Sequence, residues 1–490
     1  MQRIFGSECE YAVTGRGRWK RRGPASHDPV VRRLVEAHGQ PRIGQYLGNG
    51  ARCYPDVNAH PEWATAEVLT PDELIAHERA GELILASAAR RLGSVSEYGN
   101  RPVMILKNNH DVQANSWGSH ENYLVSRRVS IEHLSDWLSG FLTSRYIWSG
   151  AGALITSRAQ ARYAISGRAL DVRYIYGTQT TRERPLINLR DEPLGNAARY
   201  RRVHFIMGDS NMSDWVTWLK FAVTHLVLRS YEARIKRGAL VVADVRKACH
   251  GIAYDLDLVT PISLVGRARA MSALDMQYWY ADAVAKLLAR DGGEPWEHEA
   301  LQRWLMILEM LESGWQSTIG ILEWSTKLSL LESVASRARA DFAHPKIQTA
   351  SCLWHDIDPE YGFARRFEQT GRLLRAGDDA AVLYATTNPP QTTRARARGY
   401  LVQAAVGLPS SANWMHVHIG ETASRSFDRS WKEPADPDYA VEEAFTRWMA
   451  QHGMPEPVSE TFTIDEIDPL LEDEYREFQE YGPMLQPVGG

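Results

Sequence analysis

Segments of β-strand type follow one another along this 490-residue chain without the regular helix between strands that a parallel α/β fold requires. They alternate polar and apolar residues or run apolar, and turn-forming residues separate them. They lie at residues 3–14, 49–57, 103–109, 121–129, 162–166, 172–177, 185–191 and 204–211. This order predicts an α+β domain built on an antiparallel sheet with flanking helices.

Helical periodicity marks a second set of segments, at residues 29–46, 71–92, 131–146, 213–237 and much of 268–340. The segment 391–405 reads as an arginine-rich strand, and Pro, Glu and Asp dominate after residue 453. We therefore expect three parts, which are a large domain over 1–380, a small C-terminal domain over 381–452 and an acidic tail over 453–490.

Composition excludes several classes of protein. The formal net charge is −4, so bulk charge does not favour a nucleic-acid partner. The four cysteines are far apart in the chain, which argues against a disulfide framework or a zinc site. No apolar run reaches the length of a membrane span, and acids stand where a signal peptide would be apolar. We expect a cytoplasmic protein without a membrane partner, and the absence of GxGxxG and GxxxxGK[ST] excludes a standard dinucleotide or P-loop site.

Carboxylates gather on the first two expected strands, where side chains two residues apart share a face. The candidates are Glu8 and Glu10 on the first strand, Arg52, Tyr54 and Asp56 on the second, and Glu62 and Glu67 shortly after it. Converging carboxylates repel one another unless a cation neutralises them, and hard oxygen ligands suit Mg²⁺. An arginine beside them suits phosphate. The alternative is a polar sheet face in solvent, which is a common arrangement.

Three arginines, Arg394, Arg396 and Arg398, would share one face of the strand expected at 391–405. If these three side chains faced phosphates, the row would bind ATP. The alternative is a solvated edge strand protected by charge.

Polar loops at 107–123, 190–193 and 208–214 lack hydrophobic periodicity, and such loops often carry function. His204, by contrast, is expected to be structural.

These segments together resemble the Pup ligase and depupylase family. The matching blocks are MQRIFGSECEYAV, NGARCYPDVNAHPEWATAE, KNNHD, SWGSHENYL, INLRDEP, YRRVHFIMGDSNMS, HPKI, HDI and NPPQTTRARARG, in that order over most of residues 1–420. The helical stretch 255–340 matches less well.

The resemblance implies a glutamine synthetase-like fold, in which a curved antiparallel sheet binds ATP and a small C-terminal domain packs beside it. The cofactors would be ATP and Mg²⁺. Matching the motifs assigns the metal ligands Glu8, Tyr54 and Glu62, the ATP contacts Arg52, Thr65 and Trp414, and the catalytic carboxylate Asp56, to which the arginine row adds Arg394 and Arg396. The implied reaction phosphorylates the side chain of a C-terminal glutamate of Pup or a Pup-like protein. A lysine amine of an acceptor protein then attacks, with Asp56 as the base.

The family has a ligase branch and a depupylase branch. Depupylases carry a long insertion before the NGAR block, whereas residues 15–48 here are short, which favours a ligase. The alternatives are a depupylase or deamidase on the same scaffold, a ligase acting on a peptide or small molecule, and a binding protein without turnover. Cys53, Pro55 and Leu194 depart from the family pattern and bear on the choice of substrate.

The acidic end of the chain, IDEIDPLLEDEYREFQEYGPMLQPVGG at 464–490, resembles the C-terminal part of Pup. Its apolar residues recur at helical spacing, and acids outnumber its single base. The alternative is a disordered acidic tail. We expect residues 464–482 to dock in cis where free Pup binds, against a basic rim at Arg199, Arg201 and Arg202. The last residue is Gly490 and not glutamate, so a docked tail would inhibit or gate.

Overall fold

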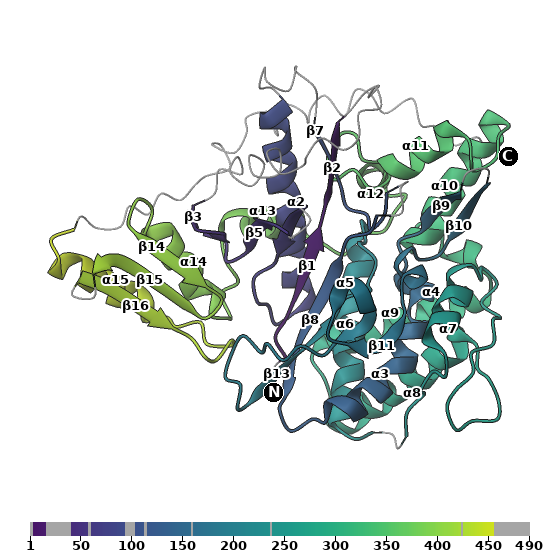
Figure 1. The fold of residues 1–490 in the computed structure, drawn as a ribbon, viewed down its shortest axis with the longest axis horizontal. Coiled ribbons are helices and arrows are strands. Elements are labelled where there is room, and N and C mark those ends of the chain that lie inside the picture. The colour runs from purple at the N-terminus through teal and green to yellow at the C-terminus, as the bar shows by residue number, and fades with distance from the viewer. Residues whose placement is uncertain are drawn as a thin grey trace.

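The computed structural model describes residues 3–15, 41–56, 60–93, 103–111, 115–157, 160–235, 238–422 and 425–454. A nine-stranded sheet occupies the middle of the molecule (Figure 1). From one edge to the other its strands are β11 (Tyr174–Gly177), β12 (Pro185–Asn188), β13 (Tyr200–Phe205), β8 (Ser119–Ser126), β1 (Phe5–Glu10), β6 (Pro61–Ala64), β5 (Arg52–Pro55), β4 (Tyr46–Leu47) and β3 (Arg42–Ile43). Neighbours pair antiparallel except β11 and β12, which are parallel. The predicted α+β class is confirmed.

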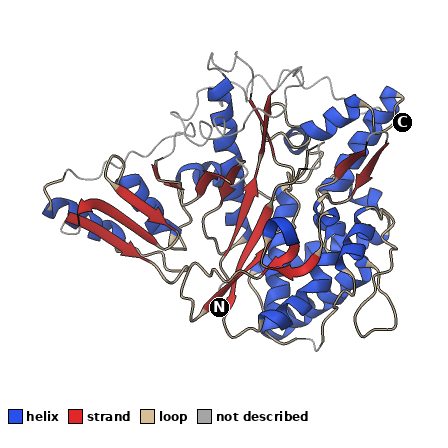
Figure 2. Cartoon of the chain, in the orientation of Figure 1, coloured by secondary structure: helices blue, strands red, loops and turns tan. Residues whose placement is uncertain are grey.

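Long helices lie on one side of this sheet and form the main hydrophobic core with it. They are α3 (Ile131–Ser144), α6 (Asp214–Glu232), α8 (Ala273–Asp291), α9 (Pro295–Glu312) and α10 (Glu323–Ala338). Serine side chains just before α3, α6 and α8 accept backbone N–H groups of the first turn, which satisfies donors that a helix start leaves unpaired. Figure 2 shows helices and strands of this arrangement in separate colours.

Helix α2 (Pro71–Gly93) runs beside β1 and contacts α6 and the strand β7. Acids occupy its first turn and arginines its last, in agreement with the helix dipole. The remaining described elements before α14 are β2 (Ala12–Gly15), β7 (Val103–Leu106), α4 (Tyr146–Ser149), β9 (Ala153–Ser157), β10 (Gln160–Ala164), α5 (Thr180–Glu183), α7 (Val245–Ala253), α11 (Pro345–Leu353), α12 (Phe363–Gln369), α13 (Asp379–Thr387) and the 3₁₀ turns Arg168–Leu170 and Trp315–Thr318.

The C-terminal elements form a smaller unit at the left of Figure 1. They are α14 (Ala395–Ala404), β14 (Ser410–Asn413), β15 (His416–Thr422), β16 (Arg425–Ser430) and α15 (Val441–Gln451). Their apolar side chains make a separate cluster, which Ile43 and Tyr46 of the sheet edge join. The domain boundary at 380/381 stays a prediction, and the tail expected over 453–490 lies outside the described residues beyond residue 454.

Two expectations about secondary structure are wrong. The arginine-rich segment is the helix α14 and not a strand, because arginine and alanine are strong helix formers. The described part of the helix expected at 29–46 is the β3–β4 hairpin, with Gly44 at a φ of 60° in its turn. Among the described residues, no helix is both long and apolar enough to cross a membrane.

Candidate functional site

Strand β1 presents its two carboxylates on the face of the sheet that the long helices leave open. Glu8 and Glu10 alternate with the buried Ser7 and Cys9, as strand geometry requires. The register places Glu10 opposite Glu62 of β6, and Glu62 opposite Tyr54 of β5. Paired residues in a sheet project to the same side, so two carboxylates and a phenol meet across three strands.

Glu8 lies in the most densely charged part of this face. His120 Nδ1 is 3.1 Å from its Oε2, and the side-chain amide of Asn122 donates to its Oε1 over 3.2 Å. From β13, Arg202 approaches to 3.6 Å and His204 to 3.6 Å. Burial alone would raise the pKa of Glu8, but the bond to His120 and the charges of His204 and Arg202 hold this pKa well below its ordinary value. Glu8 is therefore an anion.

Glu62 has the opposite character. Its burial, and next the charge of Glu8, raise the pKa of the Glu62 carboxyl to about 8. Burial also raises the pKa of Tyr54, and Glu62 and Glu8 add to this effect. Among the described side chains, no arginine or lysine forms an ion pair with Glu62, and the charge of His120 and the hydrogen bond from Tyr54 only partly oppose the rise of its pKa. A cation bound beside Glu62 would compensate its charge.

Asp56 lies at the end of β5, beside Glu10. Its side chain is only 5% exposed, and its Oδ1 accepts the backbone N–H of His60 over 2.7 Å. The imidazole of His60 lies 3.5 Å from Oδ2 and packs on Trp117, with ring centroids 5.1 Å apart. Ligand atoms of Glu10, Asp56 and His60 are all within 4.8 Å of one another. Asp56 is thus held by its neighbours at the edge of the acidic face.

The two other candidates of this region contact the same strands. The Arg52 guanidinium lies over the Tyr54 ring, 3.9 Å from its centroid, and donates to the side chain of Gln45. The hydroxyl of Thr65 accepts the backbone N–H of Ser7 over 3.0 Å. Thr65 therefore lies directly beside β1.

A pocket of about 560 Å³, part of it open to solvent, begins at Glu8 and extends along β1 toward Ile4. Its walls come from β1, β6, β8, the loop after β12 and the C-terminal unit. The lining residues are Ile4, Phe5, Gly6, Ser7, Glu8, Ala64, Thr65, Ala66, Glu67, Asn122, Tyr123, Leu124, Pro193, Leu194, Arg202, Arg394, Trp414 and Pro434. The pocket thus unites Glu8, Thr65, Arg394 and Trp414, whereas Arg52, Tyr54, Asp56, Glu62 and Arg396 lie outside its lining.

The arginine row is split, because it lies on a helix. Arg394 and Arg398, four residues apart, share a helix face and both bind Glu67, at 2.8 and 2.6 Å. Arg396 points elsewhere and pairs with Glu442 on α15. The expectation that all three share one face is wrong. Of the two predicted ATP contacts, Arg394 lines the pocket while already paired, and Arg396 does not line it.

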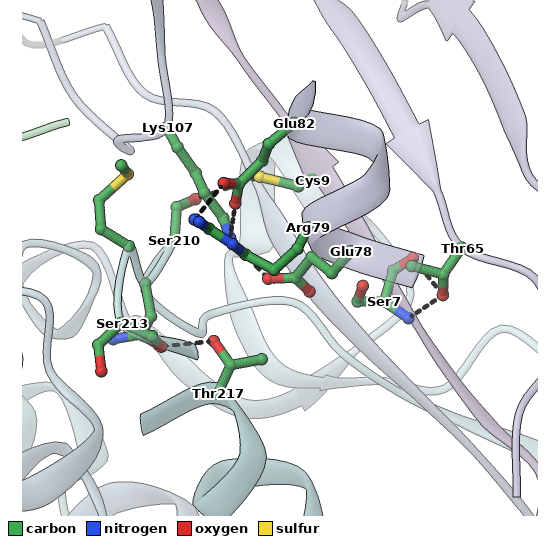
Figure 3. Close-up of polar contacts among 12 residues, drawn as sticks. Ser7, Cys9, Thr65, Glu78, Arg79, Glu82, Lys107, Ser210, Ser213 and Thr217 are labelled. Carbon is green, nitrogen blue, oxygen red and sulfur yellow. Dashed lines mark hydrogen bonds and ion pairs between the residues drawn. The ribbon is translucent and has the colours of Figure 1, made fainter. Parts of the chain in front are cut away.

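The opposite face of β1 is supported by a network of buried, paired ions on α2 and β7 (Figure 3). Lys107 donates to Glu78 over 2.6 Å and to Glu82 over 2.8 Å. Arg79 also donates to Glu82, over 2.8 Å. Burial alone would lower the pKa of Lys107, but Glu78 and Glu82 raise it, so the lysine stays charged. Lys107, Arg79, Glu78 and Glu82 are thus paired behind the strand that carries Glu8.

Most of the chain is similar in sequence to known proteins. The family model described as Pup-ligase protein matches residues 28–418. A Pup–protein ligase of Acidimicrobium ferrooxidans is 38% identical over 433 residues, which are 87% of this chain and 94% of that protein. One of Geodermatophilus obscurus is 37% identical over 435 residues, 87% of this chain and 95% of that protein. The chain belongs to the Pup ligase family.

Two solved structures of Pup ligases share its fold. The complex between the prokaryotic ubiquitin-like protein Pup and its ligase PafA has a TM-score of 0.82 and 29% identity, covering 100% of this chain and 99% of that chain. The Pup ligase PafA in complex with ADP has a TM-score of 0.76 and 29% identity, covering 89% of this chain and 97% of that chain.

Sequence reasoning missed part of this Pup ligase site. His204 was expected to be structural, yet His120, His204 and Glu8 bring ligand atoms within 4.8 Å of one another. The alternation of His120 and Asn122 in SWGSHENYL was a signal for a strand with a polar face. For His204 the only signal was the alternation of basic and apolar residues in β13. This pattern does not show which strands lie beside β13, and so it does not show that His204 lies near Glu8.

Proposed function

We propose that this protein is an ATP-dependent carboxylate–amine ligase that joins the side-chain carboxylate of a C-terminal glutamate, on Pup or a Pup-like protein, to a lysine amine of an acceptor protein. The observation that carries the proposal is the pocket that joins Glu8 and Thr65 of the sheet to Trp414 of the C-terminal unit, in a member of the Pup ligase family. A relative of this family binds ADP, and another is seen with Pup.

The acidic face fits a divalent cation. Glu8 is ionised, and burial and the charge of Glu8 raise the pKa of Glu62. A bound cation would lower the pKa of Glu62 again by neutralising the repulsion between the two carboxylates. Glu8, Glu62 and Tyr54 would hold Mg²⁺ through oxygen, the donor type that this ion prefers. Bound there, Mg²⁺ would neutralise charge on the phosphates of ATP.

The chain's own residues have distinct parts in the proposed reaction. Trp414 and Thr65 bind the nucleotide in the pocket, and Arg52, with Arg394 at the pocket wall, adds positive charge. The glutamate carboxylate attacks the γ-phosphorus, ADP leaves, and an acyl-phosphate forms. Asp56 accepts a proton from the lysine ammonium, the free amine attacks the acyl carbon, and phosphate leaves.

The ligase assignment over a depupylase rests on the short segment 15–48 and on the ligase relatives, whose sequences the chain covers almost completely. All four cysteines are free, as suits a reducing cytoplasm. We also propose the three-part division at 380/381 and 452/453, in which the small C-terminal domain supplies one wall of the pocket.

The test is incubation of the protein with Mg-ATP, Pup ending in glutamate and a lysine-bearing protein, followed by mass spectrometry. An isopeptide adduct formed together with ADP is expected. Removal of Pup from a conjugate, with no adduct formed, would support the depupylase alternative instead. Adduct formation by Asp56→Asn at the wild-type rate would remove Asp56 from the mechanism.

A second proposal concerns the tail, whose residues 464–482 lie outside the described part of the chain. Its acids suit the basic rim at β13, where Arg199 is 60% exposed and Arg202 binds Asn122 and Glu192. Tethering makes a weak contact intramolecular, so docking in cis needs little affinity. Deleting residues 455–490 should strengthen binding of added Pup. Equal affinity before and after deletion would refute docking in cis.

A further inference from the structure

The pocket has two chemically different ends. The pairing of β1 with β8 brings Leu124 to Ile4, whose carbonyl accepts the Leu124 N–H over 2.9 Å. Four residues further along β1, roughly 13 Å away at the usual strand rise, stands Glu8 with Arg202. Pro193, Leu194 and Pro434 also line the pocket, and these side chains offer no hydrogen-bond donor, whereas Glu67 and Arg394, which line it too, are paired with each other.

Leu194 reaches this pocket from a strained backbone. Its φ is 48°, in the left-handed region, which is costly for leucine. The next residue is Gly195, a residue type that adopts this region without cost. Gly195 is needed for another purpose, because a Cβ there would lie 3.2 Å from the Lys432 carbonyl and 3.3 Å from Pro434 Cγ. Asn196 N–H also donates to the Lys432 carbonyl, over 2.8 Å. Glycine is therefore required at position 195 by the close contact with the C-terminal unit, and the positive φ falls on Leu194.

A strained residue that persists at a pocket wall points to a role in binding. A nucleotide has an apolar aromatic base and a charged phosphate chain, and the two pocket ends match them. Phosphates belong at the end with Glu8 and Arg202, where a bound cation and the guanidinium offset their charge. The base then belongs at the other end, between Trp414 and the loop that carries Leu194.

We infer that Leu194 is a nucleotide-binding residue, whose side chain packs on the purine base of the nucleoside di- or triphosphate and closes the apolar end of the pocket. This inference rests on the proposed function, since it assumes that the nucleotide occupies this pocket. It also gives a reason for the leucine in the sequence RDEPL. An apolar wall holds the base by contact alone, whereas Trp414 and the sheet set its orientation.

The test measures binding of ADP and of inorganic tripolyphosphate, each with Mg²⁺, to the wild type, Leu194→Gly and Leu194→Ala. Both variants remove the side chain, so both should bind ADP about tenfold more weakly and tripolyphosphate equally well. Their melting temperatures should differ, because glycine releases the strain at φ 48° and alanine keeps it. Leu194→Gly should therefore melt higher than Leu194→Ala.

Arg339→Gly is the matched control. Arg339 also has a positive φ, of 50°, but follows helix α10 and does not line the pocket. It should gain stability from the release of strain and leave ADP binding unchanged. Wild-type affinity for ADP in both Leu194 variants would overturn the inference, as would an equal loss for ADP and tripolyphosphate. Failure of the wild type itself to bind ADP would instead refute the proposed function.

Discussion

Glu62 and Glu67 lie in one short segment of chain and are both buried, but their surroundings differ completely. Glu67 receives Arg394 and Arg398 at 2.8 and 2.6 Å. Burial alone would raise the pKa of Glu67, but the two arginines lower it to about 2. Glu62 has Glu8 and Glu10 as neighbours, and burial and the Glu8 charge raise its pKa to about 8.

The difference separates two uses of a buried acid. Glu67 is neutralised within the protein and joins the large sheet to α14 of the C-terminal unit. Glu62 lacks such compensation and is suited to a cation that arrives with the substrate. Removing an acid of the first kind should therefore harm folding, whereas removing one of the second kind should harm activity.

Asp56→Asn should show the largest effect. The amide keeps the size of the side chain but cannot accept a proton from the lysine ammonium, so ligation should fall by roughly 10²- to 10⁴-fold. The thermal transition and ADP binding should stay close to those of the wild type. Single-turnover assays with Pup, and calorimetry for ADP, measure the two properties. A folded variant that ligates at the normal rate would show that the base lies elsewhere.

Glu67→Ala should be the most damaging change to stability. It leaves two buried guanidinium groups without their carboxylate, which costs about 3–5 kcal/mol in the free energy of unfolding. Denaturant titration measures this loss. Glu62→Gln is the matched control, because it removes a buried acid that has Glu8 beside it and no arginine partner, so it should leave the unfolding free energy unchanged or higher. A loss of similar size in both variants would invalidate the distinction between the two acids.

Acid should weaken the fold through Glu67. Its pKa in the folded protein, about 2, lies below the ordinary value of 4.5, so its stabilising effect is complete above pH 4.5 and disappears as the pH falls toward 2. The shift corresponds to about 3 kcal/mol. Unfolding free energies measured between pH 5 and pH 2.5 should fall less steeply in Glu67→Gln than in the wild type. Parallel slopes would mean that other acids dominate.

Arg396→Ala should have the smallest effect. Its ion pair with Glu442 is partly exposed, and such pairs contribute about 0–1 kcal/mol. Because Arg396 does not line the pocket, ADP affinity should also be unchanged. A large loss of ADP affinity in this variant, measured by calorimetry, would show that Arg396 contacts the nucleotide. Arg394→Ala, in contrast, should destabilise the protein, because its guanidinium binds Glu67.

The sequence predicted the acidic face because strand alternation is a local property. Glu8 and Glu10 on one side of β1 follow from their spacing. The meeting of Glu62 with Tyr54 and Glu10 depends on the register of three strands, which no local pattern fixes. Arginines at alternate positions fit both a strand and a helix, so the pattern RARAR did not distinguish them, and the buried partner Glu67 lies far away in sequence. His204 was missed for the same reason.

The pocket joins segments that lie far apart in the chain. Its floor is β1, near the N-terminus, and one wall holds Trp414, which is made among the last residues of the described chain. Contacts between such distant segments form late in folding, after the loops between them close. On the ribosome, a growing chain can complete its helices long before it can complete this pocket. The proposed nucleotide site is thus completed only after synthesis has passed Trp414, so a chain that ends before this residue should bind nucleotide more weakly.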